Sequence, residues 1–300
     1  MPESVAVTGG NGRVGQHVLA HLASRGYRTV NLSRGKRGEN HADAYVETDL
    51  LDTGEVYGAL AKADPDAVVH LGMIPTPERT PGHRTYESNV MSSYNVLEAA
   101  GELGVDTAVL ASSFSAIGGG FEPEPITVDY LPVDEDHRLT PSTPYGMGKQ
   151  ALEVAADGFA RRSGDTPDTI TSLRFPWVVD DDTARETFVE ADRTLAGLRD
   201  SDHFHTQRNT LCGYVHATDA VTLVEAAVEA SFAGHERVWV SAPDTSAETP
   251  SAELAAELYP DAEYRGPEAD DGNPYAALID TAKAGQLFDW EPSWSWRQLV

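Results

Sequence analysis

The sequence predicts an α/β protein with a Rossmann-type, doubly wound parallel sheet and a smaller C-terminal substrate-binding lobe. Three observations lead to this fold class. Short apolar and β-branched runs alternate with helix-like segments over the first 175 residues. A glycine-rich stretch joins the first run to the first helical segment, and the alternation loosens beyond Phe175. Strands that alternate with helices imply parallel strands joined by right-handed crossovers.

Each expected element follows from its local pattern. Apolar and β-branched runs predict strands, and these runs are SVAVT (4–8), RTVNL (28–32), AVVHL (67–71), DTAVLAS (106–112) and TITSLRF (169–175). Helical spacing of apolar residues predicts helices within 12–26, 52–63, 86–104 and 144–164. Gly26 and Gly164 stand where C-caps are expected, and Pro144 stands where a helix can begin.

The same pattern divides the chain into two expected domains. Residues 1–175 form the Rossmann domain, which binds the cofactor predicted below from its motifs. Residues 176–300 form mainly the substrate-binding lobe, with segments near 214–242 returning to the sheet. This later part contains a charged stretch over 180–202, and no internal repeat is visible in the chain.

Length and composition describe a folded protein of enzyme size. Three hundred residues with 40% hydrophobic content can bury a substantial core. The start has no basic segment followed by an apolar stretch, and no apolar run approaches the ~20 residues that span a bilayer. Cys212 is the single cysteine. We expect a cytoplasmic protein without disulfides and without a membrane partner.

The chain is strongly acidic. It carries 48 acidic residues against 22 basic residues, a formal net charge of -26. Such a surface repels a phosphate backbone, so we expect no nucleic-acid partner. The acidic residues are scattered through segments that keep their apolar periodicity, which favours a folded halophilic protein over a disordered one. In this background each retained cation is informative.

The stretch TGGNGRVG, residues 8–15, predicts a dinucleotide site. Glycines between a strand and a helix let the backbone turn tightly and let a pyrophosphate approach the helix N-terminus. The spacing Gly-x-x-Gly-x-x-Gly differs from the better-known Gly-x-Gly-x-x-Gly, and by itself it also fits an ordinary glycine turn. The residues expected to line the cofactor here are Gly9, Asn11, Gly12, Arg13, Val14 and Gly15.

The end of the second expected strand, NLSRGKRG, indicates the type of cofactor. An acidic residue at this place holds a ribose hydroxyl, whereas arginine accommodates a 2′-phosphate. No acid appears before Glu39, and the loop carries the cations Arg34, Lys36 and Arg37 directly after Ser33. The pattern favours NADP, with NAD as a weaker cofactor. The alternative is a basic loop that is merely solvated.

An acidic stretch, TDLLD, follows the third expected strand. Asp49 within it is placed to meet the adenine amino group of the cofactor. For the neighbouring Asp52 we expect the ordinary structural role of a helix cap.

The stretch YGMGK carries the catalytic signal. Tyr145 and Lys149 are separated by four positions, so on a helix they share a face. A neighbouring ammonium favours the phenolate and brings the tyrosine pKa towards the working range. Such pairs also occur by chance on solvated helices. Here the pair follows LASSFSAIG, a strand end that delivers hydroxyls, notably Ser113, to the edge of the sheet where ligands bind.

Taken together, these stretches resemble the extended short-chain dehydrogenases/reductases grouped as NAD-dependent epimerases/dehydratases. The resemblance covers the first 180 residues well and the rest loosely. It rests on TGGNGRVG, TDL, VVHLGMIP, ESNVMSSYNVLEAA, LASSFSAIG, PYGMGK and SLRFPWVV, in family order. The further cofactor-binding positions that it implies are Leu50, Leu71, Gly72, Met73, Pro176 and Val178.

The resemblance also implies catalytic roles. Tyr145 is the catalytic base or acid, Lys149 lowers its pKa and holds the nicotinamide ribose, and Ser113 hydrogen-bonds the reacting oxygen. Asn89 matches a helix asparagine that often belongs to a proton relay, and a packing role is its alternative. The substrate is expected to meet Met73, Pro75, Ser113, Ser115, Tyr145 and Trp177. No metal site is expected.

Three departures from the family pattern bear on the substrate. The triplet after the serine strand reads Ala116-Ile117-Gly118, which selects Ser113 but leaves Ser115 open. Gly148 replaces the serine that usually precedes the lysine, a change of little expected consequence. Nucleotide-sugar enzymes of the family carry an asparagine soon after the Leu-Arg of the sixth strand, where this chain has Phe-Pro-Trp at 175–177.

We therefore predict an NADP-dependent oxidation of a free monosaccharide, an aldose or a uronate, at its C1 hydroxyl to a lactone. The motifs resemble those of uronate dehydrogenases and related aldose 1-dehydrogenases. Trp177 is placed to stack on a pyranose face, with core packing as its alternative role. A nucleotide-sugar epimerase or dehydratase with tightly bound NAD and a non-enzymatic NADP-sensing module remain as alternative functions. Relatives commonly dimerise through the helix of Tyr145, and we expect a homodimer or tetramer.

Overall fold

The computed structural model describes residues 2–36, 41–75, 79–266 and 272–300 of the chain. The chain forms two compact units, each assembled from three segments. Unit 1 comprises Met1–Ser112, Met147–Leu173 and Val221–Arg237, and unit 2 comprises Ser113–Gly146, Arg174–Ala220 and Val238–Val300.

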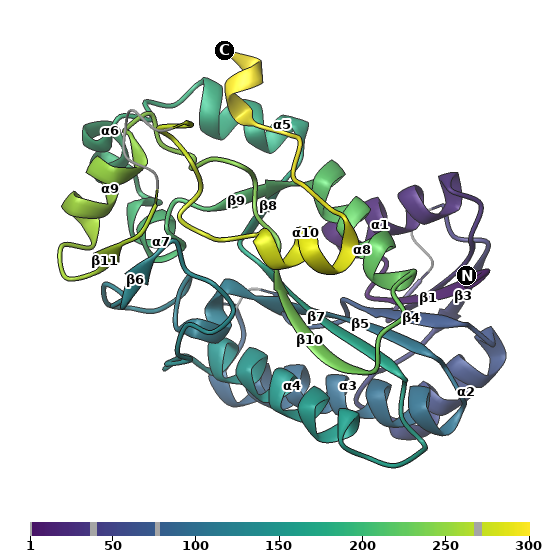
Figure 1. Ribbon diagram of the computed structural model, residues 1–300. Coiled ribbons are helices and arrows are strands. Elements are labelled where there is room, and N and C mark those ends of the chain that lie inside the picture. The colour runs from purple at the N-terminus through teal and green to yellow at the C-terminus, as the bar shows by residue number, and fades with distance from the viewer. Residues whose placement is uncertain (1, 37–40, 76–78, 267–271) are drawn as a thin grey trace. The chain divides into compact units, whose positions relative to one another are not determined.

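Unit 1 is built on a seven-stranded sheet (Figure 1). Its strands are β1 (Ser4–Thr8), β2 (Arg28–Ser33), β3 (Ala44–Glu47), β4 (Ala67–His70), β5 (Thr107–Ser113), β7 (Thr169–Phe175) and β10 (Gly234–Trp239). Their order across the sheet is β10-β7-β5-β4-β1-β2-β3. β1 pairs in parallel with β2 and β4, β2 with β3, and β4 with β5. The predicted α/β fold with a Rossmann-type parallel sheet is confirmed.

The strand order reverses beside β1. The chain runs outward from β1 through β2 to β3, and β4 then returns to the other side of β1. In doubly wound sheets the ligand crevice lies at the carboxyl ends of the strands that flank such a reversal. The loops that follow β1 and β4 begin with Gly9 and Leu71, so the topology places a ligand site at these two loops.

Helices cover both faces of this sheet. Their bounds are α1 (Arg13–Ser24), α2 (Thr53–Ala63), α3 (Gly82–Glu102), α4 (Pro144–Ala160) and α8 (Ala217–Val228). Figure 1 shows α2, α3 and α4 along one face and α1 with α8 along the other. Glu225 of α8 joins the latter two, because its carboxylate lies 2.7 Å from both His21 Nε2 of α1 and Arg25 Nε at the C-cap of α1.

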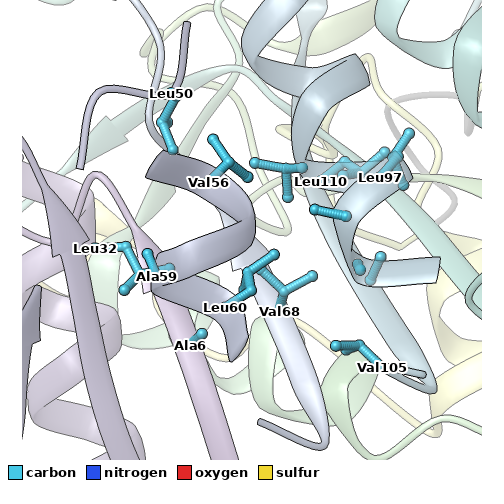
Figure 2. Close-up of a cluster of buried hydrophobic side chains, with 14 of the residues drawn as sticks. Ala6, Leu32, Leu50, Val56, Ala59, Leu60, Val68, Leu97, Val105 and Leu110 are labelled. Carbon is cyan, nitrogen blue, oxygen red and sulfur yellow. The ribbon is translucent and has the colours of Figure 1, made fainter. Parts of the chain in front are cut away.

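The main core of unit 1 lies between the sheet and helices α2 and α3 (Figure 2). The buried residues of α2, at positions 56, 59, 60 and 63, recur at helical spacing and form one apolar stripe. This stripe packs in one cluster with Ala6, Leu32 and Val68 of the strands and Leu97 of α3. Burying one such leucine side chain stabilises the fold by about 1.5–3 kcal/mol.

Unit 2 contains two small parallel sheets and short helices. Its strand pairs are β8 (Trp177–Val179) with β9 (Tyr214–His216) and β6 (Tyr130–Leu131) with β11 (Glu263–Tyr264). Its helices are α5 (Asp181–Ala184), α6 (Leu195–Asp200), α7 (Phe204–Asn209), α9 (Ser251–Leu258) and α10 (Ala282–Phe288), with 3-10 turns at Phe114–Ile117 and Trp296–Leu299 and a π-helical turn at Arg185–Val189.

Within the described residues, no helix combines the length and the apolar character needed to cross a membrane.

Candidate active site

The glycine-rich turn after β1 approaches the loop after β4 very closely. Gly9 has φ +70°, and a Cβ on it would lie 2.7 Å from the Cα of Gly72. A Cβ on Gly15 would lie 2.4 Å from the carbonyl oxygen of Gly9, so both positions require glycine. Helix α1 begins at Arg13 without a side-chain cap on Gly12. The turn therefore forms the side-chain-poor cradle that fits a pyrophosphate at a helix N-terminus.

A polar network fixes the glycine-rich turn to the end of β2. The Ser33 hydroxyl donates to Asn31 Oδ1 at 2.7 Å, and the Asn11 backbone N–H donates to the Ser33 hydroxyl at 3.3 Å. Asn31 Nδ2 donates to Asn11 Oδ1 at 3.0 Å. Asn11 Nδ2 in turn donates to the carbonyl oxygen of Lys36 at 3.3 Å. The loop backbone is thereby held beside the turn, while the Arg34 and Lys36 side chains are exposed.

Not every predicted residue of this loop is described. Arg37 lies outside the described residues, so the cations of the loop with a described position are Arg34 and Lys36. Tyr45 of β3, which sequence reasoning missed, supports the loop from the other side. Its hydroxyl lies 2.8 Å from the Ser33 carbonyl oxygen and 2.5 Å from the Gly35 carbonyl oxygen.

The segment after β3 carries the predicted cofactor positions Asp49 and Leu50 and the expected cap Asp52. Asp52 caps α2, because its carboxylate accepts the Glu55 N–H at 3.0 Å. Asp49 Oδ1 accepts the Leu51 N–H at 3.1 Å, and the Asp49 side chain is partly exposed. Leu50 is buried, and its carbonyl oxygen accepts a hydrogen bond from Asn95.

Thr8 at the end of β1 holds the loop after β4. Its hydroxyl accepts the N–H groups of Leu71 and Gly72, each at 3.1 Å. It also lies 2.8 Å from His70 Nδ1. The opening threonine of the glycine-rich motif thus sets the close approach of the two loops.

Asn89 of α3 supports the same segment further along. Its side-chain Oδ1 accepts the Ile74 N–H at 2.8 Å, and its Nδ2 donates to the Ile74 carbonyl oxygen at 3.2 Å. Asn89 is fully buried, whereas Pro75 beside Ile74 is exposed. A Cβ at Gly148 would stand 3.4 Å from the Asn89 Cβ, an ordinary contact, so the Cβ of the serine that is usual in the family would also fit at this position.

Lys149 of α4 is buried at 4% exposure. Its Nζ donates to the carbonyl oxygen of Ala111 at 2.5 Å and contacts the sulfur of Met73 at 2.9 Å. Burial lowers the pKa of Lys149 to about 7, and the negative charge of Glu153 opposes that shift. An ammonium in this place is therefore close to its titration point at neutral pH.

In unit 2 the structure brings Ser113 and Tyr145 together by a hydrogen bond between their side chains. Gly146 permits this approach, since a Cβ there would lie 2.6 Å from the Ser115 carbonyl oxygen. The ring of Phe121 packs edge-on against Tyr145 at a centroid distance of 5.3 Å. Ser115 is buried, and its N–H donates to the Ser113 hydroxyl at 3.1 Å.

The pKa of Tyr145 departs from the expectation drawn from the sequence. Burial raises it to about 12, and the hydrogen bond with Ser113 opposes the rise. The reason lies in the surroundings, because the phenol is 9% exposed and the ammonium one turn along α4 is itself destabilised by burial. Desolvation of the phenol therefore outweighs the hydrogen bond with Ser113.

The segment after β7 brings Trp177 into contact with another aromatic ring of unit 2. Trp177 begins β8, and its ring packs edge-on against Phe188 at a centroid distance of 5.8 Å. Trp177 and Val178 keep partial exposure, as does Pro176, while Phe175 is buried. Trp177 therefore combines core packing with an accessible edge.

A protein-family model matches most of the chain. The model described as the NAD dependent epimerase/dehydratase family matches residues 5–240. The chain belongs to this family. The predicted resemblance is thereby confirmed, and the NAD dependent epimerase/dehydratase family is an enzyme family that uses a nicotinamide dinucleotide.

Curated relatives point to two kinds of activity within the family. A UDP-glucose 4-epimerase of Rhizobium leguminosarum bv. trifolii is 34% identical over 158 residues, which are 51% of this chain and 46% of the relative. An L-arabinose 1-dehydrogenase (NAD(P)(+)) of Haloferax volcanii is 30% identical over 202 residues, which are 65% of this chain and 75% of the relative. The match thus covers about half of the epimerase's length, whereas it covers three quarters of the dehydrogenase's length.

Two solved structures of low sequence identity share the fold of this chain. MoeE5 in complex with UDP-glucuronic acid and NAD has a TM-score of 0.69 at 23% identity, over 98% of this chain and 95% of that chain. A mutated uronate dehydrogenase has a TM-score of 0.66 at 20% identity, over 100% of this chain and 86% of that chain.

Proposed function

We propose that the protein oxidises a free monosaccharide, an aldose or a uronate, at its C1 hydroxyl to a lactone, with NADP as the preferred hydride acceptor. The observation that carries this proposal is the hydrogen-bonded pair of Ser113 and Tyr145, at the start of the helix that also carries Lys149. A hydroxyl pair beside a lysine is suited to remove a proton from an alcohol.

Two features support a free sugar over a nucleotide sugar. The segment after β7 offers Pro176 and Trp177 where nucleotide-sugar enzymes of this family carry an asparagine for the diphosphate. The dehydrogenase relative from Haloferax volcanii adds support, because the match spans three quarters of its length.

In the proposed reaction, side chains handle the proton and the cofactor handles the hydride. Tyr145 takes the proton of the C1 hydroxyl, while Ser113 donates a hydrogen bond to the same oxygen and orients it. A nicotinamide cofactor, when bound, would supply the redox chemistry as the hydride acceptor. The electron pair of the broken O–H bond forms the new C=O bond of the lactone, so one proton and one hydride leave the sugar.

For Tyr145 to act as a base at neutral pH, its pKa must be lowered by a nearby positive charge. A phenol with a pKa of about 12 is a weak base at neutral pH. A charged Lys149, one helical turn away, favours the phenolate and donates to the nicotinamide ribose. The hydrogen bond from Lys149 to the Ala111 carbonyl oxygen fixes the position of the ammonium.

The basic loop supports NADP. The exposed side chains of Arg34 and Lys36 follow the end of β2, where the 2′ position of an adenine ribose lies in this fold. The Gly9–Gly72 approach leaves no room for side chains at the pyrophosphate cradle. An arginine with a phosphate forms a charge-assisted and often bidentate contact, which supports preference for NADP over NAD.

A panel of aldoses and uronates, assayed with NADP and NAD in high salt, tests this function. We expect reduction of NADP by at least one free sugar and a lactone product identified by NMR spectroscopy. Lack of turnover with every free sugar, together with turnover of a UDP-sugar, would contradict the proposal.

A nucleotide-sugar epimerase is the second candidate, because the 34% identical relative from Rhizobium is named a UDP-glucose 4-epimerase. Such an enzyme retains its cofactor through the catalytic cycle. Native mass spectrometry of the purified protein after gel filtration distinguishes the two candidates, since a dehydrogenase must release the reduced cofactor.

A further inference from the structure

Glu153 is a buried carboxylate that neither the sequence motifs nor the reaction above uses. It lies on α4, four positions after Lys149, and is 0% exposed. Its carboxylate accepts a hydrogen bond from the Ser112 hydroxyl at 2.6 Å and from Arg237 Nε at 3.1 Å. Because a buried charge is costly unless it is paired, its retention in the core calls for a compensating role.

The partners of Glu153 belong to one chain of hydrogen-bonded polar groups. Arg237 of β10 also donates to Asp157, one turn further along α4. Asp157 lies 2.9 Å from His235 Nδ1, and His235 Nε2 lies 2.8 Å from the Ser172 hydroxyl. Burial lowers the pKa of His235, so this imidazole is neutral at neutral pH. Burial opposes the shift at Asp157, but its hydrogen bonds with His235 and Arg237 lower the pKa of this carboxyl.

The charges of this cluster balance only when Lys149 is charged. Glu153 and Asp157 supply two negative charges, and Arg237 supplies one positive charge shared between them. The Lys149 ammonium supplies the second positive charge. Lys149 and Glu153 are both buried, where an unbalanced charge is penalised strongly, so the Glu153 carboxylate favours the protonated lysine.

The other groups around Lys149 do not replace this compensation. His70 of β4 is fully buried and burial lowers its pKa to about 3, so it is neutral. The remaining contacts of the Lys149 ammonium described above are the Ala111 carbonyl oxygen and the Met73 sulfur, which carry no net charge. Glu153 is the carboxylate whose negative charge opposes the effect of burial on the Lys149 pKa.

We propose that Glu153 is a positioning residue, whose buried carboxylate keeps Lys149 charged and so keeps its ammonium available to the Tyr145 phenol and the cofactor ribose. The part about the phenol and the ribose rests on the proposed function. The part about the charge of Lys149 does not. Ser112 and Arg237 hold the carboxylate in place on the side of α4 that carries Lys149.

A merely structural role for Glu153 makes a different forecast. A tie between α4, β5 and β10 would affect the melting temperature when it is weakened, but it would leave the titration of Lys149 unchanged. The Glu153→Gln variant separates the two roles, because the amide keeps the shape while the charge is lost: its oxygen can still accept from Arg237 and its NH2 can donate to the Ser112 hydroxyl.

The test is an NMR titration of lysine side chains in protein labelled with ¹³C,¹⁵N-lysine. The chain has four lysines, Lys36, Lys62, Lys149 and Lys283, so the Lys149 signal can be assigned by comparison with Lys149→Met. We expect the titration midpoint of Lys149 to fall by about one pH unit or more in Glu153→Gln. Glu153→Asp, which restores a carboxylate, should stay near the wild-type midpoint.

Two further variants keep the test decisive. Ser112→Ala removes a hydrogen bond of Glu153 but not its charge, and its Lys149 midpoint should stay near that of the wild type. Arg237→Gln removes the competing cation and should raise the Lys149 midpoint, which gives a result even if Glu153→Gln fails to fold. Unchanged midpoints in Glu153→Gln or in Arg237→Gln overturn the proposal.

Activity measurements then test the part of the proposal that concerns the Tyr145 phenol and the cofactor ribose. The alkaline limb of kcat/KM for sugar oxidation should move to lower pH in Glu153→Gln by the same amount as the Lys149 midpoint. A wild-type protein that oxidises no sugar contradicts the proposed function, yet leaves the NMR result standing. A moved midpoint with an unmoved pH profile shows that the charge of Lys149 is set by Glu153 but is not used in the reaction, and this overturns the positioning role.

Discussion

The Tyr45 hydroxyl donates a hydrogen bond to the Ser33 carbonyl oxygen at 2.8 Å. This contact joins β3 to the last residue of β2, and the same hydroxyl reaches the Gly35 carbonyl oxygen in the loop that follows. Asn11 of the glycine-rich turn holds that loop through the Lys36 carbonyl oxygen. The backbone that presents Arg34 is therefore fixed from two sides. A preorganised arginine loses less conformational entropy on binding than one on a free loop.

Replacing Arg34 by Ala should raise the KM for NADP by about 10- to 150-fold, the equivalent of roughly 1.5–3 kcal/mol for hydrogen bonds to a charged group. The kinetics with NAD should change little, because NAD lacks the 2′-phosphate, so NAD serves as the internal control. Measurement of kcat/KM with both cofactors checks this. Equal effects on the two cofactors, or a wild-type preference for NAD, would contradict the assignment.

Replacing Tyr145 by Phe should lower kcat for sugar oxidation by about 10²- to 10⁴-fold, the range expected for loss of a positioned acid or base. The ring and its edge-on contact with Phe121 are retained, so folding and cofactor affinity should be nearly unchanged. Steady-state kinetics and a cofactor-binding titration on the same preparation check both statements. Near wild-type kcat would show that another group is the base.

The parallel sheet was predictable because its strands are nearly continuous apolar runs joined by helical segments. Residues 4–8 of β1 and 169–175 of β7 agree with the predicted strands to the residue. Gly26 has φ +93° just after α1, as a C-cap requires. Helix α4, in contrast, ends at Ala160, so Gly164 lies beyond it, since the polar stretch Arg-Arg-Ser at 161–163 supplies no apolar residue that would continue the buried face of the helix.

The environment of the candidate site was less predictable than its motifs. Spacing alone put Tyr145 and Lys149 on one helix face, but it carried no information about desolvation, which dominates both pKa values. Tyr45 and Glu153 were missed because their partners, Ser33 and Arg237, are far away in sequence. For Glu153 a signal did exist, since it continues the four-residue spacing that joins Tyr145 to Lys149.

Replacing Leu60 by Ala should destabilise the protein by about 2–5 kcal/mol, because the cavity forms in a close-packed core. Leu60 of α2 is 1% exposed and belongs to the main cluster of unit 1. Leu51 is 43% exposed, so Leu51→Ala is the matched control and should cost at most about 0.5 kcal/mol. Chemical denaturation of both variants checks the difference, and similar losses would show that the core assignment is wrong.

Withdrawing salt should destabilise the fold. A net charge of -26 repels itself over a Debye length of about 30 Å at 0.01 M salt but only about 3 Å at 1 M. The melting temperature should therefore rise steadily with sodium chloride concentration. Sucrose at equal osmolality is the control, because it does not screen charge. Equal melting temperatures at low and high salt would remove the prediction of a halophilic protein.

Acid should destabilise the wild type through His70. This imidazole is fully buried between the Thr8 hydroxyl at 2.8 Å and the Ser93 hydroxyl at 3.2 Å. Burial lowers its pKa from 6.5 to about 3. Above pH 6.5 the imidazole is neutral in both folded and unfolded chains. Below that value only the unfolded chain binds the proton, so stability falls with pH until the folded pKa is reached.

The size of this effect follows from the shift. Between about pH 6.5 and pH 5 the wild type should lose about 2 kcal/mol more than His70→Gln, whose side chain does not titrate. The comparison uses the pH dependence of each variant, so any constant cost of the substitution cancels, as do the carboxylates common to both proteins. Urea unfolding at a series of pH values provides the measurement. Parallel stability curves for the two proteins would show that His70 can take up a proton in the folded state.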